Sequence, residues 1–377
     1  MKSRKAHKLA LIVGLIFWAS MGLTGYLHAQ ESAKSYAAHG NDYLLKGRLD
    51  DAINAYGKAL ELNPKDSESC NNRGKAYRAK GQYDLAIKDY DKAIELNPAD
   101  ASYYSNRGGA YRAKGQYDLA IKDYDKAIEL SPTDAMSYNN RGLAQSDNAQ
   151  YDSAVKDFDK ALELNPKFVG AFNNRGMVYR AKGQYDTAIK DFDKAIEINP
   201  GDAASYNNRG GAYRAKGQYD QAISDFDKAV ELNPRDAVSY NNRGSAYRAK
   251  GQYHPAIKDF DRAIELNPTD ASSYNNRGLA QSDNGQYDLA INDFDKAIAL
   301  NPQSAAAYSN RGSAYRAKLR YELAIKDYDK AIELNPKLAA AYYNRGSIYQ
   351  KQGNLTQSQD DYKKAVELNP EFAKMPY

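Results

Sequence analysis

Proline recurs along this chain at a fixed spacing of 34 residues, and that spacing constrains the fold more than any other feature. The prolines that keep it are Pro64, Pro98, Pro132, Pro166, Pro200, Pro234, Pro268, Pro302, Pro336 and Pro370. Glycine follows the same spacing from Gly40 to Gly346, and no insertion breaks the register. A constant period of this length indicates a repeat architecture in which each unit is one supersecondary element. The ten units are expected at residues 33–66, 67–100, 101–134, 135–168, 169–202, 203–236, 237–270, 271–304, 305–338 and 339–372.

The unit at residues 67–100 shows why each repeat is expected to hold two helices. Its second half places Ala86, Tyr90, Ala93 and Ile94 at helical spacing on one face. Gly81 lies between the two apolar runs and suits the C-terminus of a helix.

Other residues predict where the helices begin and end. Asp84 stands at a suitable place for an N-cap of the second helix, and Asp100 at one for the first helix of the next unit. Asn97 and Pro98 are expected to stop the second helix. Each unit is therefore predicted to be a helix, a tight turn, a second helix and a turn.

A pair of short amphipathic helices cannot bury its apolar face alone, so the units are expected to stack into a solenoid. In the last repeat, Gln357, Ser358 and Gln359 occupy places that are apolar elsewhere. Polar residues there suit a face without a following neighbour, and we expect this repeat to cap the array. Residues 373–377 are a short tail.

The unit resembles the tetratricopeptide repeat in particular residues. Those residues are Gly74, Tyr77, Ala86, Tyr90, Ala93 and Pro98, and copies of the pattern cover residues 33–372. The resemblance implies an all-α, right-handed superhelical solenoid of ten 34-residue helix-turn-helix repeats. Cys70 stands where the family carries an aromatic residue, which favours a packed core role.

A regular departure from the family is arginine before the repeated glycine, from Arg73 and Arg107 to Arg345, where the family usually has leucine. We expect the arginine stem to pack while its guanidinium reaches an aspartate of the second helix, such as Asp89.

Charge and cysteine content exclude several classes of protein. The formal net charge is +5, but residues 1–29 contain no acidic residue, so the remainder is nearly neutral. That balance is a weak electrostatic basis for binding nucleic acid, and none is expected. Cys70 is the single cysteine, so no internal disulfide forms.

Residues 1–29 are expected to be a signal peptide or an N-terminal membrane anchor. A basic start is followed by an apolar run over residues 9–27. Cleavage after Ala29 would release a periplasmic or secreted protein. The run is also long enough to anchor the chain in the inner membrane. Both alternatives place the repeats outside the cytoplasm.

The first helices carry a row of asparagines two residues before the repeated glycine. The row consists of Asn72, Asn106, Asn140, Asn174, Asn208, Asn242, Asn276, Asn310 and Asn344. An amide both donates and accepts hydrogen bonds, so such a row can pair with the backbone of an extended peptide. It resembles the asparagine ladder that holds peptide in the repeat domain of O-GlcNAc transferases. In the resembled family the first helices line the concave face.

Six arginines follow on the same helices and predict a basic groove. They are Arg78, Arg112, Arg180, Arg214, Arg248 and Arg316. Ser146-Asp147 and Ser282-Asp283 replace them in the fourth and eighth repeats as two acidic interruptions. A basic wall suggests partners with Asp, Glu or a free C-terminal carboxylate. Copying of one repeat by duplication is the alternative explanation of both rows.

No pattern of residues predicts enzymatic chemistry. Asp89 and Asp91 point in different directions on one helix and read as solvated charge rather than a metal pair. No phosphate-binding loop and no cluster with metal-ligand spacing is present in the sequence. We therefore expect neither catalysis, nor a cofactor, nor a small-molecule substrate.

The sequence thus predicts an exported scaffold that binds extended, possibly acidic, segments of other proteins along its concave groove. The alternative is a non-catalytic subunit or targeting module of an envelope enzyme complex, such as a glycosyltransferase or a secretion machine. A membrane is expected as a partner only through the possible N-terminal anchor.

Overall fold

The computed structural model describes residues 30–375, and these fold into paired helices joined by short turns. The first helix of each repeat is formed by residues 30–45, α3 (Ser67–Ala79), α5 (Ala101–Ala113), α7 (Ala135–Asp147), α9 (Val169–Ala181), α11 (Ala203–Ala215), α13 (Ala237–Ala249), α15 (Ala271–Asp283), α17 (Ala305–Ala317) and α19 (Ala339–Lys351). The second helices are α2 (Leu49–Leu62), α4 (Tyr83–Leu96), α6 (Tyr117–Leu130), α8 (Tyr151–Leu164), α10 (Tyr185–Ile198), α12 (Tyr219–Leu232), α14 (Tyr253–Leu266), α16 (Tyr287–Leu300), α18 (Tyr321–Leu334) and α20 (Leu355–Leu368). The predicted all-α repeat solenoid is confirmed.

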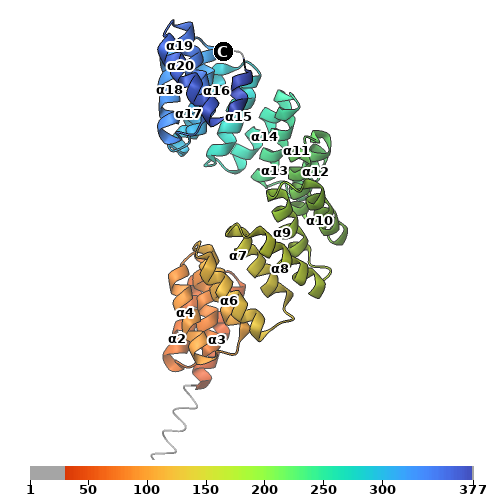
Figure 1. Cartoon of the computed structure of the whole chain (residues 1–377). Coiled ribbons are helices and arrows are strands. Elements are labelled where there is room, and N and C mark those ends of the chain that lie inside the picture. The colour runs from red at the N-terminus through yellow and green to blue at the C-terminus, as the bar shows by residue number, and fades with distance from the viewer. Residues whose placement is uncertain (1–29, 376–377) are drawn as a thin grey trace, which may run out of the picture. The chain divides into compact units, whose positions relative to one another are not determined.

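The chain divides into two compact units, one ending at Val178 and the other beginning at Tyr179. Within each unit the helices stack in chain order, as Figure 1 shows. From α2 to α8 and from α10 to α20, each helix contacts the next one along the chain, and successive first helices such as α3 and α5, or α11 and α13, also touch. The first helices of a unit therefore line one continuous face, which we call the first-helix face.

The repeated glycine is explained by the close approach of the two helices in a repeat. A Cβ added at Gly74 would lie 2.7 Å from Cε1 of Tyr90, and one at Gly142 would lie 2.8 Å from Cε1 of Phe158. These rings are buried completely. A larger residue at the glycine would push the helix pair apart, because interiors are close-packed.

The turn inside each repeat uses a second glycine in the left-handed conformation, such as Gly81 with φ +74°. Ala149 (φ 57°) and Leu319 (φ 60°) replace it in two repeats and hold the same conformation. Asn97 is the C-cap of α4, as predicted. The predicted N-cap at Asp84 is wrong: Gln82 is the N-cap of α4, and Asp84 lies in the first turn.

The caps of the first helices follow the prediction. Asp100 accepts a hydrogen bond from the backbone amide of Ser102 at 2.9 Å. Asp134 accepts from the amides of Met136 and Ser137. These carboxylates satisfy amide groups that the helix itself leaves without a partner.

The arginine before the repeated glycine joins helices within and between repeats. Arg107 donates two hydrogen bonds to Asp123, at 2.8 and 2.7 Å, and a third to Asp91 of the preceding repeat at 2.6 Å. Arg73 binds Asp89 in the same two-bonded way, which confirms the predicted pairing.

The description of Asp89 as solvated charge is wrong, because Asp89 is only 6% exposed. Its neighbour Asp91 is exposed but is the acceptor for Arg107 of the next repeat. The two carboxylates point apart on α4 because they serve two different arginines. This periodic arrangement ties each helix pair to the next.

The last repeat is covered differently from the prediction. Ser358 does not lie on an open face: it is 1% exposed and donates a hydrogen bond to the carbonyl of Gly346. A short 3₁₀ helix, η1 (Pro370–Lys374), follows α20. Its Phe372 stacks on Tyr343 with ring centroids 4.9 Å apart. These contacts extend the array beyond residue 372.

Two further expectations concern single regions of the chain. Cys70 is 3% exposed and packs with Ala93 and Tyr103, which confirms its core role. The expected leader, residues 1–29, lies outside the described residues. Among residues 30–375, no helix is both long and apolar enough to cross a membrane.

Candidate peptide-binding face

The asparagine row and the six arginines lie on the first-helix face of their units. Every asparagine of the row, from Asn72 to Asn344, is half-buried, so part of its side chain remains open to solvent. The arginines are half-buried as well, apart from Arg78, which is exposed. Polar side chains fixed on rigid helices suit recognition, because little side-chain freedom is lost on binding.

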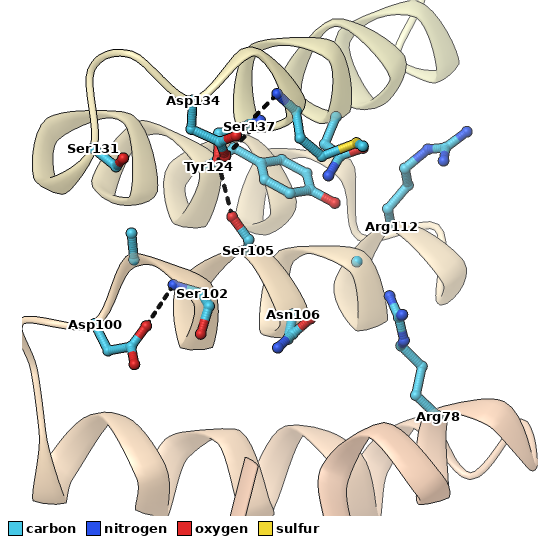
Figure 2. A pocket seen from close by; sticks show the side chains of 14 residues that line it. Arg78, Asp100, Ser102, Ser105, Asn106, Arg112, Tyr124, Ser131, Asp134 and Ser137 are labelled. Atoms are coloured by element: carbon cyan, nitrogen blue, oxygen red, sulfur yellow. Dashed lines mark hydrogen bonds between the residues drawn. The ribbon is translucent and has the colours of Figure 1, made fainter. Parts of the chain in front are cut away.

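A pocket of about 660 Å³ on this face lies between α3, α5 and α7. Four predicted site residues meet there: Arg78, Asn106, Arg112 and Asn140. Figure 2 shows both arginines at one end of the pocket, Asp100 and Ser131 at the other, and Asn106 between them. The pocket therefore has a basic end and an acidic end.

A tyrosine adds a hydroxyl group to the wall of this pocket. Tyr124 lines it, and burial raises the pKa of Tyr124 to about 12. Its hydroxyl group is therefore protonated at neutral pH and can donate a hydrogen bond.

A second pocket of about 330 Å³ lies at the start of the array. It contains Asn72, whose amide donates to Asn41 at 3.2 Å. Asn41 occupies the first repeat, where the sequence has Ala38 in place of the row asparagine. Sequence analysis missed Asn41, because it stands outside the repeating pattern.

Hydrogen bonds divide the asparagine row into two sets, which alternate from Asn106 to Asn344. Asn72 belongs to the bonded set, because it donates to Asn41. Asn106, Asn174, Asn242 and Asn310 each donate to an asparagine of the preceding repeat, at 2.8 to 3.0 Å. The acceptors are Asn71, Asn139, Asn207 and Asn275.

The second set, which we call the free amides, comprises Asn140, Asn208, Asn276 and Asn344. Within residues 30–375 their side-chain amides make no hydrogen bond to the protein. Five asparagines of the row thus join one repeat to the next, and the other four are available to a ligand. The sequence shows nine similar asparagines and does not reveal this alternation.

The six arginines also differ in their hydrogen-bond partners. Arg112 donates to Asp147 and Arg248 to Asp283, each at 2.6 Å. Arg316 donates to the hydroxyl group of Ser347 at 3.0 Å. The acidic interruptions predicted in the fourth and eighth repeats therefore neutralise the arginine of the repeat before them. The face is less uniformly basic than predicted.

Two arginines on the second unit behave differently. In the described part of the chain, neither Arg180 nor Arg214 forms an ion pair. Burial lowers the pKa of Arg180. Burial also lowers the pKa of Arg214, and the charge of Arg180 lowers it further. Two guanidinium groups that repel each other without an acidic partner are a place where an anion would be stabilised.

The face offers hydrogen-bonding groups rather than reactive ones. Within residues 30–375, no group of three or more His, Cys, Asp or Glu side chains is arranged to hold a metal ion. Burial raises the pKa of the Cys70 thiol to about 11, and Cys70 lies in the core beside Ala93. A rigid stack of helix pairs with a polar binding face defines a helical-repeat protein–protein interaction scaffold.

Comparison with known protein families agrees with this class. A model described as "TPR repeat" matches residues 40–77, 74–111, 108–148, 244–285 and 312–353. Models described as "Tetratricopeptide repeat" match residues 135–168, 169–202, 203–236, 226–258, 271–304 and 339–372. The chain belongs to the tetratricopeptide repeat family. Scaffolds of this family are typically non-catalytic, and the models identify no catalytic domain.

Two solved structures show the same fold. A tetratricopeptide repeat protein from Parabacteroides merdae superposes with a TM-score of 0.57 and 24% identity, over 67% of this chain and 99% of that one. The Cut9–Hcn1 hetero-tetramer of the APC/C matches with a TM-score of 0.50 and 15% identity, over 90% of this chain and 94% of that one. MamA is 30% identical over 45% of this chain and 93% of its own, with a TM-score of 0.41. No curated protein sequence matches the chain significantly.

Proposed function

We propose that this protein is an exported scaffold that binds extended, acidic segments of other proteins along its first-helix face. The main observation in support of this proposal is the set of free amides. Asn140, Asn208, Asn276 and Asn344 are held half-buried without a side-chain partner, one in every second repeat. A backbone amide of an extended peptide needs such a donor and acceptor pair, whatever its side chains.

The preference for acidic segments rests on the charges of the face. Arg78, Arg180 and Arg214 have no carboxylate partner among the described residues, whereas the acidic caps such as Asp100 already bind backbone amides. An acidic peptide would gain charge-assisted hydrogen bonds that a neutral peptide cannot form. Export rests on the composition of residues 1–29, a basic start before an apolar run.

A pull-down from an envelope extract, with partners identified by mass spectrometry, tests the binding face. One variant replaces the four free amides by alanine and should lose the bound proteins while its melting temperature stays unchanged. The matched control replaces Asn106, Asn174, Asn242 and Asn310 by alanine. These four bind neighbouring repeats, so the control should melt earlier.

Retention of the same partners by the free-amide variant would show that binding lies elsewhere on the molecule. Recovery of one enzyme in stoichiometric amount would instead identify the chain as a non-catalytic subunit of that enzyme. Fractionation of cells tests export separately: the repeats should be accessible to protease added outside the inner membrane.

A further inference from the structure

Arg180 and Arg214 occupy equivalent places in two successive repeats, near the C-terminal ends of α9 and α11. Both are half-buried, and Arg214 follows Gly211 by three residues on α11. Burial and the charge of Arg180 lower the pKa of Arg214. Arg180 lies against the backbone of α11, since a Cβ added at Gly211 would be 2.5 Å from its Nη1. A larger residue at Gly211 would displace the end of the Arg180 side chain.

The same construction occurs three repeats earlier, in the pocket of Figure 2. There Arg78 lies against Gly109, where an added Cβ would be 2.5 Å from its Nη1. Arg112 stands beside it in the pocket. The difference is that Arg112 binds the carboxylate of Asp147, at the end of α7.

Sequence spacing explains why Arg112 is neutralised and Arg214 is not. Asp147 stands 35 residues after Arg112, and Asp283 stands 35 residues after Arg248. The residue at the same spacing from Arg214 is Ala249, at the end of α13. The residue at the same spacing from Arg180 is Ala215, another alanine. The chain supplies a carboxylate to Arg112 and to Arg248, but it supplies none at this spacing to Arg180 or Arg214.

We propose that Arg180 and Arg214 form a subsite for the side-chain carboxylate of an Asp or Glu in a bound peptide. In this subsite the bound peptide provides the carboxylate, whereas Arg112 receives its carboxylate from Asp147 of the same chain. Asn208 and Asn242, on α11 and α13, correspond to the Asn106 and Asn140 that line the pocket of Figure 2. This inference rests on the proposed function and names the acidic contact within it.

The test uses two fluorescent peptides of about twelve residues, alternating Ser and Ala, with an amidated C-terminus. One carries a central Glu and the other a central Gln. Fluorescence anisotropy should show that the protein binds the Glu peptide about ten-fold more tightly, the usual effect of one charge-assisted hydrogen bond. The preference should fall as salt is added.

Two variants should abolish this preference without unfolding the protein. Arg214→Gln removes one guanidinium group. Ala249→Asp places a carboxylate where Asp147 stands relative to Arg112, so it should occupy Arg214 internally. The converse variant, Asp147→Ala, frees Arg112 and should strengthen binding of the Glu peptide, because it adds a second subsite in the first unit.

Equal affinity for the Glu and Gln peptides, or no measurable binding of either, overturns the subsite. So does a Glu preference that survives Ala249→Asp. A phosphoserine peptide that outcompetes the Glu peptide would overturn the choice of carboxylate, as would a Gln peptide that gains equal affinity from a free C-terminus. Loss of both peptides in the free-amide variant, with the Glu preference unchanged in Arg214→Gln, would uphold the binding face and reject the subsite.

Discussion

The arginine before each repeated glycine connects three helices with one side chain. Arg107 binds Asp123 of its own repeat and Asp91 of the one before. The bonds to Asp123 come first among the causes that raise the pKa of Arg107. The guanidinium group therefore stays charged at any pH that proteins survive. A leucine in this place would leave a buried carboxylate without a partner.

Arg107→Leu should destabilise the protein by about 3 kcal/mol, because it strands the charge of Asp123. The double variant Arg107→Leu/Asp123→Leu should recover most of that loss, since it removes both charges from the interior. Urea unfolding of the two variants and the parent measures the difference. A double variant as unstable as the single one would mean that Arg107 stabilises through packing alone.

The loss in Arg107→Leu should also depend on pH. Burial raises the pKa of Asp123 above its usual value, even though hydrogen bonds from Arg107 oppose the rise. When the pKa of a carboxyl group is higher in the folded than in the unfolded state, its contribution to protein stability falls as the pH rises above the unfolded pKa of about 4. The deficit should therefore be smaller at about pH 4 than at about pH 7. A deficit that is constant over this range contradicts the role of the stranded charge.

Cys70 should be nearly inert in the folded protein. Burial raises the pKa of its thiol to about 11, and the thiolate is the reactive form. Ellman's reagent at about pH 8 should react slowly with the native chain and at once with the chain in concentrated guanidinium. Rapid reaction of the native protein would show that the second repeat opens easily.

At the scale of the helix and the turn, two of the tight turns have another residue in place of the usual glycine. Ala149 and Leu319 hold the left-handed conformation that the turn requires. That conformation costs an L-residue about 1–2 kcal/mol, which glycine avoids. Glycine gains more freedom in the unfolded chain, so the net benefit of replacement is smaller.

Ala149→Gly and Leu319→Gly should each stabilise the protein by about 0.5 kcal/mol. Their urea midpoints, compared with the parent, measure the gain. Gly81→Ala, at a turn with φ +74°, is the reciprocal control and should destabilise. Destabilisation by Ala149→Gly would mean that the unfolded-state entropy of glycine exceeds the strain in the turn.

The paired helices, their period, the Asp100 cap and the Arg73–Asp89 pairing followed from the sequence, because each depends on residues at fixed spacings. The errors concern burial and partners. Asp84 looked like a cap although α4 begins one residue earlier, and Ser358 looked exposed although it is buried against α19. The alternation of the asparagines and the Arg112–Asp147 pair depend on contacts between repeats. Those contacts depend on how neighbouring repeats pack, which the spacing of residues in the sequence does not define.

At the scale of the whole molecule, each repeat contacts its neighbours alone within a unit. Stability is then close to a sum of repeat and interface contributions. From Asn106 to Asn344, bonded asparagines and free amides alternate from repeat to repeat, whereas Asn72 and Asn106 are both bonded.

Removal of residues 203–270, two whole repeats, should leave a folded protein. The deletion joins Asp202 to Ala271, which restores the Asp N-cap that Asp270 supplies to α15. Helicity per residue, measured by circular dichroism, should be unchanged, with a modest fall in melting temperature. Removal of residues 203–218, which deletes α11 alone, is the control and should cause a large loss of helicity. Equal damage from both deletions would contradict nearest-neighbour stability.

The pairing of Arg112 with Asp147 has a consequence for how such a chain diversifies. Asp147, Ala249 and Asp283 stand in the last turn of their helices, where they take no part in packing the helix pairs. A single nucleotide change can exchange alanine and aspartate codons there. Descendants of one repeat array can therefore acquire or lose an acidic-ligand contact one mutation at a time, while the fold they inherit stays the same.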